Sequence, residues 1–220
     1  MKKLIFAVLL GCQLLLTIVC AANTSQPIAE QQLIDLLQQY TTYSANFTEA
    51  TSDAKNLAIM PSSGHVMIKK PGLFFWETLT PNHQQVMSNG KSMWIYDVDL
   101  AQATQRPAVI PGQIEPAKIL AGDGSELSQY FTIERMTTHV ANNQSVFTLT
   151  AKQDNAVFSK ITMSFQQGRL VKIVALNNLD QTSTFTFSNI QLNQPIDSSI
   201  FTFKPPKGVD VLQDTSANAN

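Results

Sequence analysis

The residues that could catalyse a reaction or bind a metal lie far apart in this sequence. His65, His83 and His139 have no carboxylate or Cys at metal-ligand spacing, so a zinc or iron site has little support. Asp97 and Asp99 would share one side of a continuing strand, as a catalytic carboxylate pair or a weak cation site does. We prefer a solvated strand end and turn, where Asp is favoured.

Catalytic and phosphate-binding motifs are also missing from the sequence. It contains no Gly-x-Ser-x-Gly elbow, no glycine-rich phosphate loop and no Walker-type Lys. Sequons at Asn23, Asn46 and Asn143 match a pattern so short that chance matches are common. We therefore expect no enzyme, no cofactor and no metal site. The formal net charge of -1, with no long basic run, gives no indication of nucleic-acid binding.

The first residues have the layout of a secretory signal peptide. Lys2 and Lys3 precede an apolar run that ends in small residues, so we expect export and cleavage after Ala21 or Ala22. An uncleaved membrane anchor is the alternative. Residues 9–12 faintly resemble a lipoprotein processing box, but the apolar run continues for several residues beyond them.

The mature chain is expected to form one domain without a disulfide. Both cysteines, Cys12 and Cys20, lie within the apolar run, although the exported compartment would permit a disulfide. Removal of residues 1–22 leaves 198 of the 220 residues, which suits one sheet-rich domain with a sizeable core. We assign this single domain to residues 23–212 and expect residues 213–220 to form a flexible tail.

The hydrophobic pattern predicts one helix followed by many strands. Leu33, Leu36, Leu37 and Tyr40 recur at i, i+3, i+4 and i+7, which places them on one stripe of an amphipathic helix. From Tyr43 onward the period changes to two, and Val, Ile, Thr and Phe become frequent. The fold class is therefore mainly β with a few helices.

Turn residues indicate a mainly antiparallel sheet. Asn89-Gly90 and Gln167-Gly168 each separate two alternating runs, and Asn-Gly supplies the positive φ angles of a tight hairpin. Pro and Gly break the pattern over residues 107–124, where residues 115–121 fit a short helix. Composition favours a surface loop with one helical turn, and a mobile helix across the mouth of the sheet is the alternative. Residues 201–203 fit a final strand, followed by a break at Pro205-Pro206 and another short extended piece that ends at about Val211.

Large apolar side chains are in excess between residues 67 and 97. They fill almost every other place across two strand-like runs, which is more than one sheet face needs. Because this surplus follows a signal peptide, it suggests a sheet whose concave face holds an apolar ligand.

Four segments resemble, in order, the family of periplasmic outer-membrane lipoprotein carriers, LolA. They are YSANFT (43–48), IKKPGLFFW (68–76), VMSNGKSMWIYD (86–97) and FTFKPPKGV (201–209). The match spans nearly the whole mature chain. It implies an unclosed antiparallel β-barrel, or half-barrel, with a helical lid over a hydrophobic cavity.

The resemblance also implies a task. A carrier of this family is a monomeric periplasmic chaperone that accepts acylated lipoproteins from an inner-membrane ABC-transporter release complex and delivers them to an outer-membrane lipoprotein receptor. A related half-barrel lipid-binding protein, receptor-like or glycolipid-binding, is the main alternative. An exported lipid hydrolase is a third hypothesis, which lacks a recognisable nucleophile and base.

The match further suggests which residues meet the ligand. The candidates for the acyl cavity or its rim are Phe47, Phe74, Trp76, Met93 and Ile95. Aromatic and Met side chains at strand spacing also build ordinary cores, and strand register decides which set faces inward. Flexible Met side chains suit acyl chains of varied shape, and the candidates are Met67, Met87 and Met93.

The lid hypothesis has five residues and one latch candidate. The apolar lid residues are Leu33, Leu36, Leu37, Ile119 and Leu120. The family commonly has Arg before the Pro of the third-strand motif, where its guanidinium holds the lid by hydrogen bonds to backbone oxygens, whereas this chain has Lys70. Lys keeps the charge but loses the planar fork of donors. Lys70 is therefore either a weaker latch or a solvated charge at a strand end.

Overall fold

The computed structural model describes residues 25–55, 57–108, 116–137 and 143–214, so the predicted signal peptide lies outside the described residues. The helices are α1 (Ser25–Gln38), α2 (Pro116–Ala121), α3 (Leu127–Tyr130) and the 3-10 helix η1 (Ser198–Phe201). The strands are β1 (Thr42–Ser52), β2 (Ala58–Lys69), β3 (Leu73–Thr80), β4 (Gln84–Asn89), β5 (Ser92–Asp97), β6 (Gln102–Pro107), β7 (Phe131–Met136), β8 (Gln144–Ala151), β9 (Phe158–Gln166), β10 (Arg169–Asn177), β11 (Thr182–Leu192) and β12 (Asp210–Gln213).

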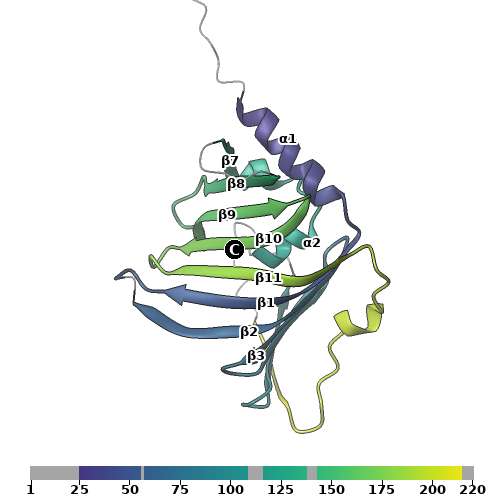
Figure 1. Cartoon of the computed structure of the whole chain (residues 1–220). Helices are drawn as coiled ribbons and strands as arrows, with labels where there is room; N and C mark the ends of the chain where they lie inside the picture. The colour runs from purple at the N-terminus through teal and green to yellow at the C-terminus, as the bar shows by residue number, and fades with distance from the viewer. Residues whose placement is uncertain (1–24, 56, 109–115, 138–142, 215–220) are drawn as a thin grey trace, which may run out of the picture.

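The described strands form one open sheet. Their order is β12-β6-β5-β4-β3-β2-β1-β11-β10-β9-β8-β7, so the first and last strands do not pair with each other. Neighbouring strands are antiparallel, apart from β12, which pairs in parallel with β6. The sheet is curved, and α1 lies near its β7 end (Figure 1). This confirms the predicted fold class, an unclosed and mainly antiparallel sheet with a few helices.

Turn chemistry sets the local strand pairing. Gly90 has φ +84°, and the side chain of Asn89 accepts hydrogen bonds from the backbone amides of Lys91 and Ser92. Gln167 and Gly168 also have positive φ angles. Gln167-Gly168 therefore forms the predicted hairpin turn, whereas the first turn consists of Gly90 and Lys91, one residue later than predicted, because Asn89 still belongs to β4.

One apolar core joins the helices to one face of the sheet, here called the inner face. Leu33 and Leu37 of α1 and Leu120 of α2 are fully buried in the same cluster as Phe74 and Met93 of the sheet. The helical stripe therefore packs on the sheet, as expected for an amphipathic helix. No helix in the described part of the chain is long and apolar enough to cross a membrane.

Two local predictions near the C-terminus were wrong. Residues 201–203 do not form a strand, because Asp197 caps η1 by accepting a hydrogen bond from the Ser199 amide, and Phe201 ends that helix. The short extended piece predicted after Pro205-Pro206 is confirmed as β12. Gln213, assigned to the polar tail, is the last residue of β12, because it pairs with Gln105.

Candidate functional site

Strand register assembles the apolar inner face in two rows across β1 to β5. The first row contains Tyr43, Ile68, Phe74, Ser88 and Met93, and the second contains Ala45, Val66, Trp76, Val86 and Ile95. In the third row Phe47 lies opposite Gly64, and Thr78, Gln84 and Asp97 continue it. On β3 to β5 the apolar surface therefore includes the first two rows and not the third.

The structure brings all five candidate ligand residues to this inner face. Phe47, Phe74 and Met93 are buried, whereas Trp76 and Ile95 are half-buried. Trp76 is the centre of an aromatic group: its ring centroid lies 4.7 Å from that of Phe47, 5.3 Å from that of Phe185 and 6.3 Å from that of Phe187. Such tilted and edge-on ring pairs are favourable.

Gly64 has two effects beside this aromatic group. A Cβ atom on Gly64 would lie 1.8 Å from the Glu77 carbonyl oxygen, so only Gly fits between β2 and β3 here. The absence of a side chain at Gly64 also leaves the position opposite Phe47 without a neighbour on β2.

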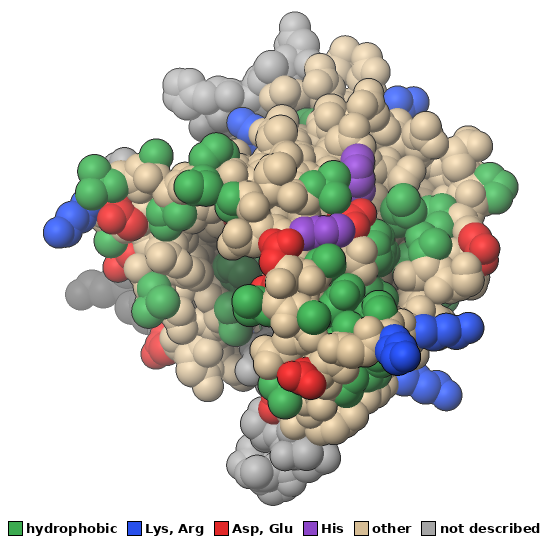
Figure 2. Space-filling view, turned by 90° about the horizontal axis from the view of Figure 1, so that it is seen from below, with side chains coloured by type: hydrophobic (Ala, Val, Ile, Leu, Met, Phe, Trp, Pro, Cys, Tyr) green, Lys and Arg blue, Asp and Glu red, His purple; other side chains and the backbone are tan. Residues whose placement is uncertain are grey.

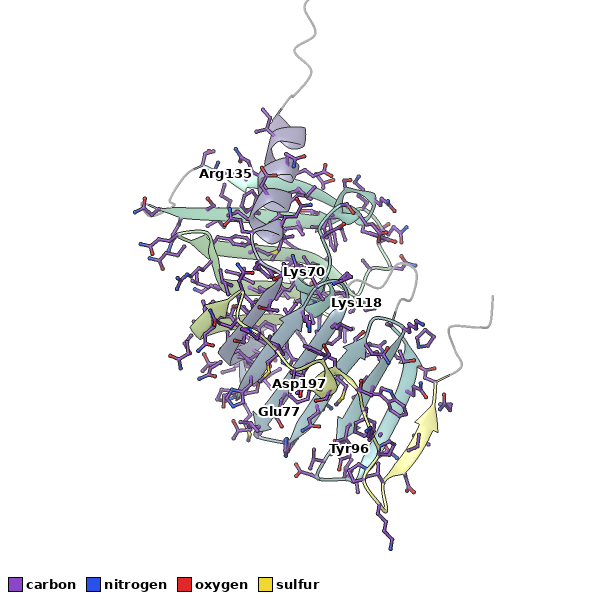
Figure 3. All side chains as sticks on the ribbon, turned by 90° about the vertical axis from the view of Figure 1, so that its right-hand side faces the viewer. Lys70, Glu77, Tyr96, Lys118, Arg135 and Asp197 are labelled. Carbon is purple, nitrogen blue, oxygen red and sulfur yellow. The ribbon has the colours of Figure 1, made fainter. Side chains whose placement is uncertain are left out.

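The outer face of the same strands has an apolar layer of its own. Met67 and Met87 lie there in register with Phe75, so of the three Met candidates for acyl contact only Met93 lies on the inner face. Residues 194–209, here called the C-terminal strap, cover this layer. Phe203 stacks on Trp94 at 4.9 Å and on Tyr96 at 5.2 Å, measured between ring centroids. In Figure 3 the strap runs past Asp197 towards Tyr96.

The lid residues cover the inner face. Leu33 and Leu37 of α1 and Ile119 and Leu120 of α2 are buried in the shared core, and Leu36 is half-buried against it. The short helix that residues 115–121 fit is confirmed as α2 (Pro116–Ala121), but its last three residues are buried, so the favoured interpretation as a surface loop with one helical turn was wrong. Burial of three apolar side chains in one helical turn stabilises the helix, although the surrounding residues are typical of a loop.

Lys70 sits where α1 meets the sheet (Figure 3). Its Nζ donates a hydrogen bond to the Leu37 carbonyl oxygen near the end of α1 and lies 4.1 Å from the ring centroid of Tyr40. Burial lowers the pKa of the Lys70 ammonium to about 8, and the charge of Asp123 opposes that shift. These contacts are those of a residue that joins helix to sheet, not those of a fully solvated charge.

Two hydrogen bonds to backbone carbonyl oxygens hold α2 in the same place. The Tyr40 hydroxyl donates to the Leu120 carbonyl oxygen at 3.1 Å, and the Gly72 amide donates to the Ala121 carbonyl oxygen at 2.9 Å. These bonds satisfy carbonyls that a helix of this length cannot pair internally. The lid and the start of β3 thus meet at one junction.

A pocket of about 370 Å³ opens beside this junction. Phe74, Ile119 and Leu127 supply apolar lining, and Lys118 and Asp123 supply polar lining. The pocket lies between α2, α3 and the end of the sheet that holds the β2–β3 and β4–β5 turns, so it adjoins both the lid and the inner face.

Titratable groups outside the junction form no recognisable catalytic site in the described residues. Asp97 and Asp99 accept hydrogen bonds from the amides of Leu100 and His83, which is the predicted turn role. His83 Nε2 lies 2.8 Å from Glu77 Oε1. Figure 2 shows His side chains beside acidic ones on the surface. His139 lies outside the described residues.

The charge state of Glu77 follows from its neighbours. Partial burial opposes ionisation, but hydrogen bonds from His83 and Gln85 outweigh it and lower the pKa of Glu77. Within the described ranges no group of three or more His, Cys, Asp or Glu residues could hold a metal ion.

Residues 38–204 match the family model described as outer membrane lipoprotein carrier protein LolA. The chain belongs to the LolA family. The outer-membrane lipoprotein carrier protein of Coxiella burnetii (strain CbuK_Q154) is 40% identical over 191 residues, which are 86% of this chain and 89% of the relative. The protein of that name from Pseudomonas paraeruginosa (strain DSM 24068 / PA7) is 33% identical over 88% of this chain and 91% of its own length.

The fold is also found in a distant solved structure. An uncharacterized conserved protein from Thermus thermophilus superposes with a TM-score of 0.54 at 11% identity, covering 84% of this chain and 98% of the other. At that identity the likeness concerns the fold alone. The LolA family assignment therefore rests on the sequence matches.

Sequence reasoning missed several residues of the inner face. Phe185 and Phe187 of β11 contact Trp76 because β11 pairs with β1, far away in the chain, where Phe187 lies opposite Phe47. The alternation of Phe in residues 182–187 placed both side chains on one face, but nothing local identified the partner strand. The hydroxyl of Tyr40 was missed because Tyr40 counted only as the last apolar position of a helix.

Proposed function

We propose that the mature protein carries the acyl chains of lipoproteins across the periplasm. It accepts them from an inner-membrane ABC-transporter release complex and delivers them to an outer-membrane lipoprotein receptor. The main support for this proposal is the way in which the inner face is covered. Two separate helices, and not a second sheet, bury its apolar surface, and such a cover can be displaced by a ligand.

The proposed ligand surface combines the inner face with the lid. Phe47, Phe74, Trp76, Met93 and Ile95 are the residues that acyl chains would contact, because they share one face of the sheet. The lid consists of Leu33, Leu36, Leu37, Ile119 and Leu120, with Lys70 as its latch. The pocket beside α2 would be the first space available to a ligand.

The energies of lid and ligand are comparable. Burial of one acyl chain of about a dozen methylenes is worth on the order of 10 kcal/mol, at about 0.8 kcal/mol each. Burial of the four fully covered lid side chains, Leu33, Leu37, Ile119 and Leu120, is worth roughly 6 to 12 kcal/mol. Loading therefore exchanges one buried apolar surface for another, and the net affinity stays small enough for release.

This exchange makes an energy source within the carrier unnecessary. Lipoprotein can pass down a gradient of affinity without nucleotide hydrolysis by this chain, and no catalytic residue, cofactor or metal takes part. The protein acts as a monomer in the periplasm, after export and removal of a signal peptide near Ala21 or Ala22.

Mass spectrometry of the protein purified from periplasm, together with whatever copurifies, tests this proposal. Intact triacylated lipoproteins are the expected ligands. Free lipids or glycolipids alone would indicate a related half-barrel lipid-binding protein, and cleaved lipid products would indicate a hydrolase. Either result would contradict the carrier function.

A further inference from the structure

Two side chains hold the two lid helices at one junction. The Lys70 ammonium donates to the Leu37 carbonyl oxygen of α1 and lies over the ring of Tyr40, 4.1 Å from its centroid. The Tyr40 hydroxyl donates to the Leu120 carbonyl oxygen of α2 at 3.1 Å. The Tyr40 ring therefore contacts Lys70 through its face and α2 through its hydroxyl.

We propose that Tyr40 is a positioning residue of the lid, and that Lys70 and Tyr40 together form a two-part latch in which Lys70 holds α1 and Tyr40 holds α2. The consequence for ligand loading rests on the proposed carrier function. The coupling of the two helices does not, because it is a property of the empty protein.

The chemistry of Lys explains why a second side chain is needed. A guanidinium at position 70 would offer a planar fork of five N–H donors to backbone oxygens of the lid. The Lys70 ammonium is a compact charge, and its hydrogen bond in this structure goes to Leu37. The Tyr40 hydroxyl supplies the bond to α2 that the ammonium does not make.

The position of Leu120 makes that bond matter. Leu120 is fully buried, and it lies one residue before the end of α2, where helical carbonyls have no partner within the helix. Without the hydroxyl, its carbonyl oxygen would be left unpaired in an apolar core, which is unfavourable. Burial also raises the pKa of Tyr40, so the hydroxyl stays protonated and remains a donor.

The chain offers a matched control in Tyr43. It too is buried, and its hydroxyl donates at 3.1 Å to a backbone carbonyl oxygen, but that oxygen belongs to Leu170 in the sheet. Tyr40→Phe and Tyr43→Phe therefore remove the same group from similar surroundings. Only the first removes a bond to the lid, and both keep the aromatic ring that fills the core.

The test is amide hydrogen exchange of the empty protein. In Tyr40→Phe we expect the amides at the C-terminal end of α2, such as that of Gly122, to exchange about tenfold faster, the effect of one lost buried hydrogen bond. In Tyr43→Phe we expect those amides to exchange as in the parent. Unchanged α2 exchange in Tyr40→Phe, or equal acceleration in both variants, would overturn the proposal.

A second substitution tests whether Tyr40 positions α2 through its hydrogen bond or only packs against it. Lys70→Arg added to Tyr40→Phe should return α2 exchange to within about twofold of the parent, because the fork supplies spare donors for the lid. No rescue would refute the division of labour between the two residues. These outcomes do not depend on the ligand, so failure of the lipoprotein to copurify would contradict the carrier function and leave the latch intact.

Discussion

Replacement of Leu37 by Ala is expected to make the empty protein easier to load. The Leu37 side chain is fully buried, and its Cδ1 lies so near Gly124, beyond α2, that a Cβ added there would be 3.2 Å from it. A buried Leu→Ala change typically costs about 2 to 5 kcal/mol. If the lid opens to admit a ligand, Leu37 is buried only in the closed state, so the change weakens closure.

The size of the effect follows from the population of the open state. At the lower end of that range, a loss of about 2 to 3 kcal/mol shifts the closed-to-open equilibrium by roughly 30- to 150-fold, since each 1.4 kcal/mol is a factor of ten. While the open state is a minority, apparent affinity for a ligand that binds it rises by the same factor. The Kd for an acylated lipopeptide should therefore fall by about that amount.

Met87→Ala is the matched control for this experiment. Met87 is also buried, but it lies on the outer face of β4, beside the C-terminal strap. Fluorescence titration with the lipopeptide should show tighter binding for Leu37→Ala and an unchanged Kd for Met87→Ala, although both variants lose stability. If Leu37→Ala binds no more tightly than Met87→Ala, the lid does not compete with the ligand.

Three further predictions concern other parts of the structure. Loading should change the fluorescence of a Trp94→Phe variant, whose remaining Trp76 lies on the inner face, and should leave that of Trp76→Phe unchanged; the opposite pattern would place the ligand on the outer face. Burial beneath the lid lowers the pKa of Lys70 to about 8, and an open lid that exposes the ammonium to water would return this pKa towards its ordinary value, so between these two values the open state would bind more protons and closure would become more favourable as pH rises. Probe affinity should accordingly fall over this range in the parent but not in Lys70→Met, and equal pH profiles would refute the assignment. Gly64→Ala should lower the free energy of unfolding by about 3 kcal/mol in urea denaturation, since its Cβ would lie 1.8 Å from a carbonyl oxygen, whereas Gly122→Ala, with no atom nearer than 3.2 Å, should cost less.

The sequence specified the sheet well because its signals are local. Period-two alternation and the dipeptides Asn89-Gly90 and Gln167-Gly168 act over a few residues, and they place strands and hairpins directly. The pairing of β1 with β11 has no such signal. It closes a loop of more than a hundred residues, and it is decided by which apolar faces fit together in the core.

The structure of the lid could also be predicted only in part from the sequence. The stripe through Leu33 and Leu37 predicted a packed helix. Around α2 the composition favoured a loop instead, because proline and glycine residues outnumber the apolar residues of α2 that become buried. The role of the Tyr40 hydroxyl was invisible in the sequence, since its acceptor lies 80 positions away. Similarly, only strand register separates Met93 from Met67 and Met87.

The central claim is that a bound acyl chain takes the place of the lid on the inner face. Amide hydrogen exchange of α1 and α2, compared between the empty protein and the protein loaded with a triacylated lipoprotein, measures this directly. We expect faster exchange in both helices after loading, with little change in β9 and β10. Unchanged or slower exchange in α1 and α2 would contradict it.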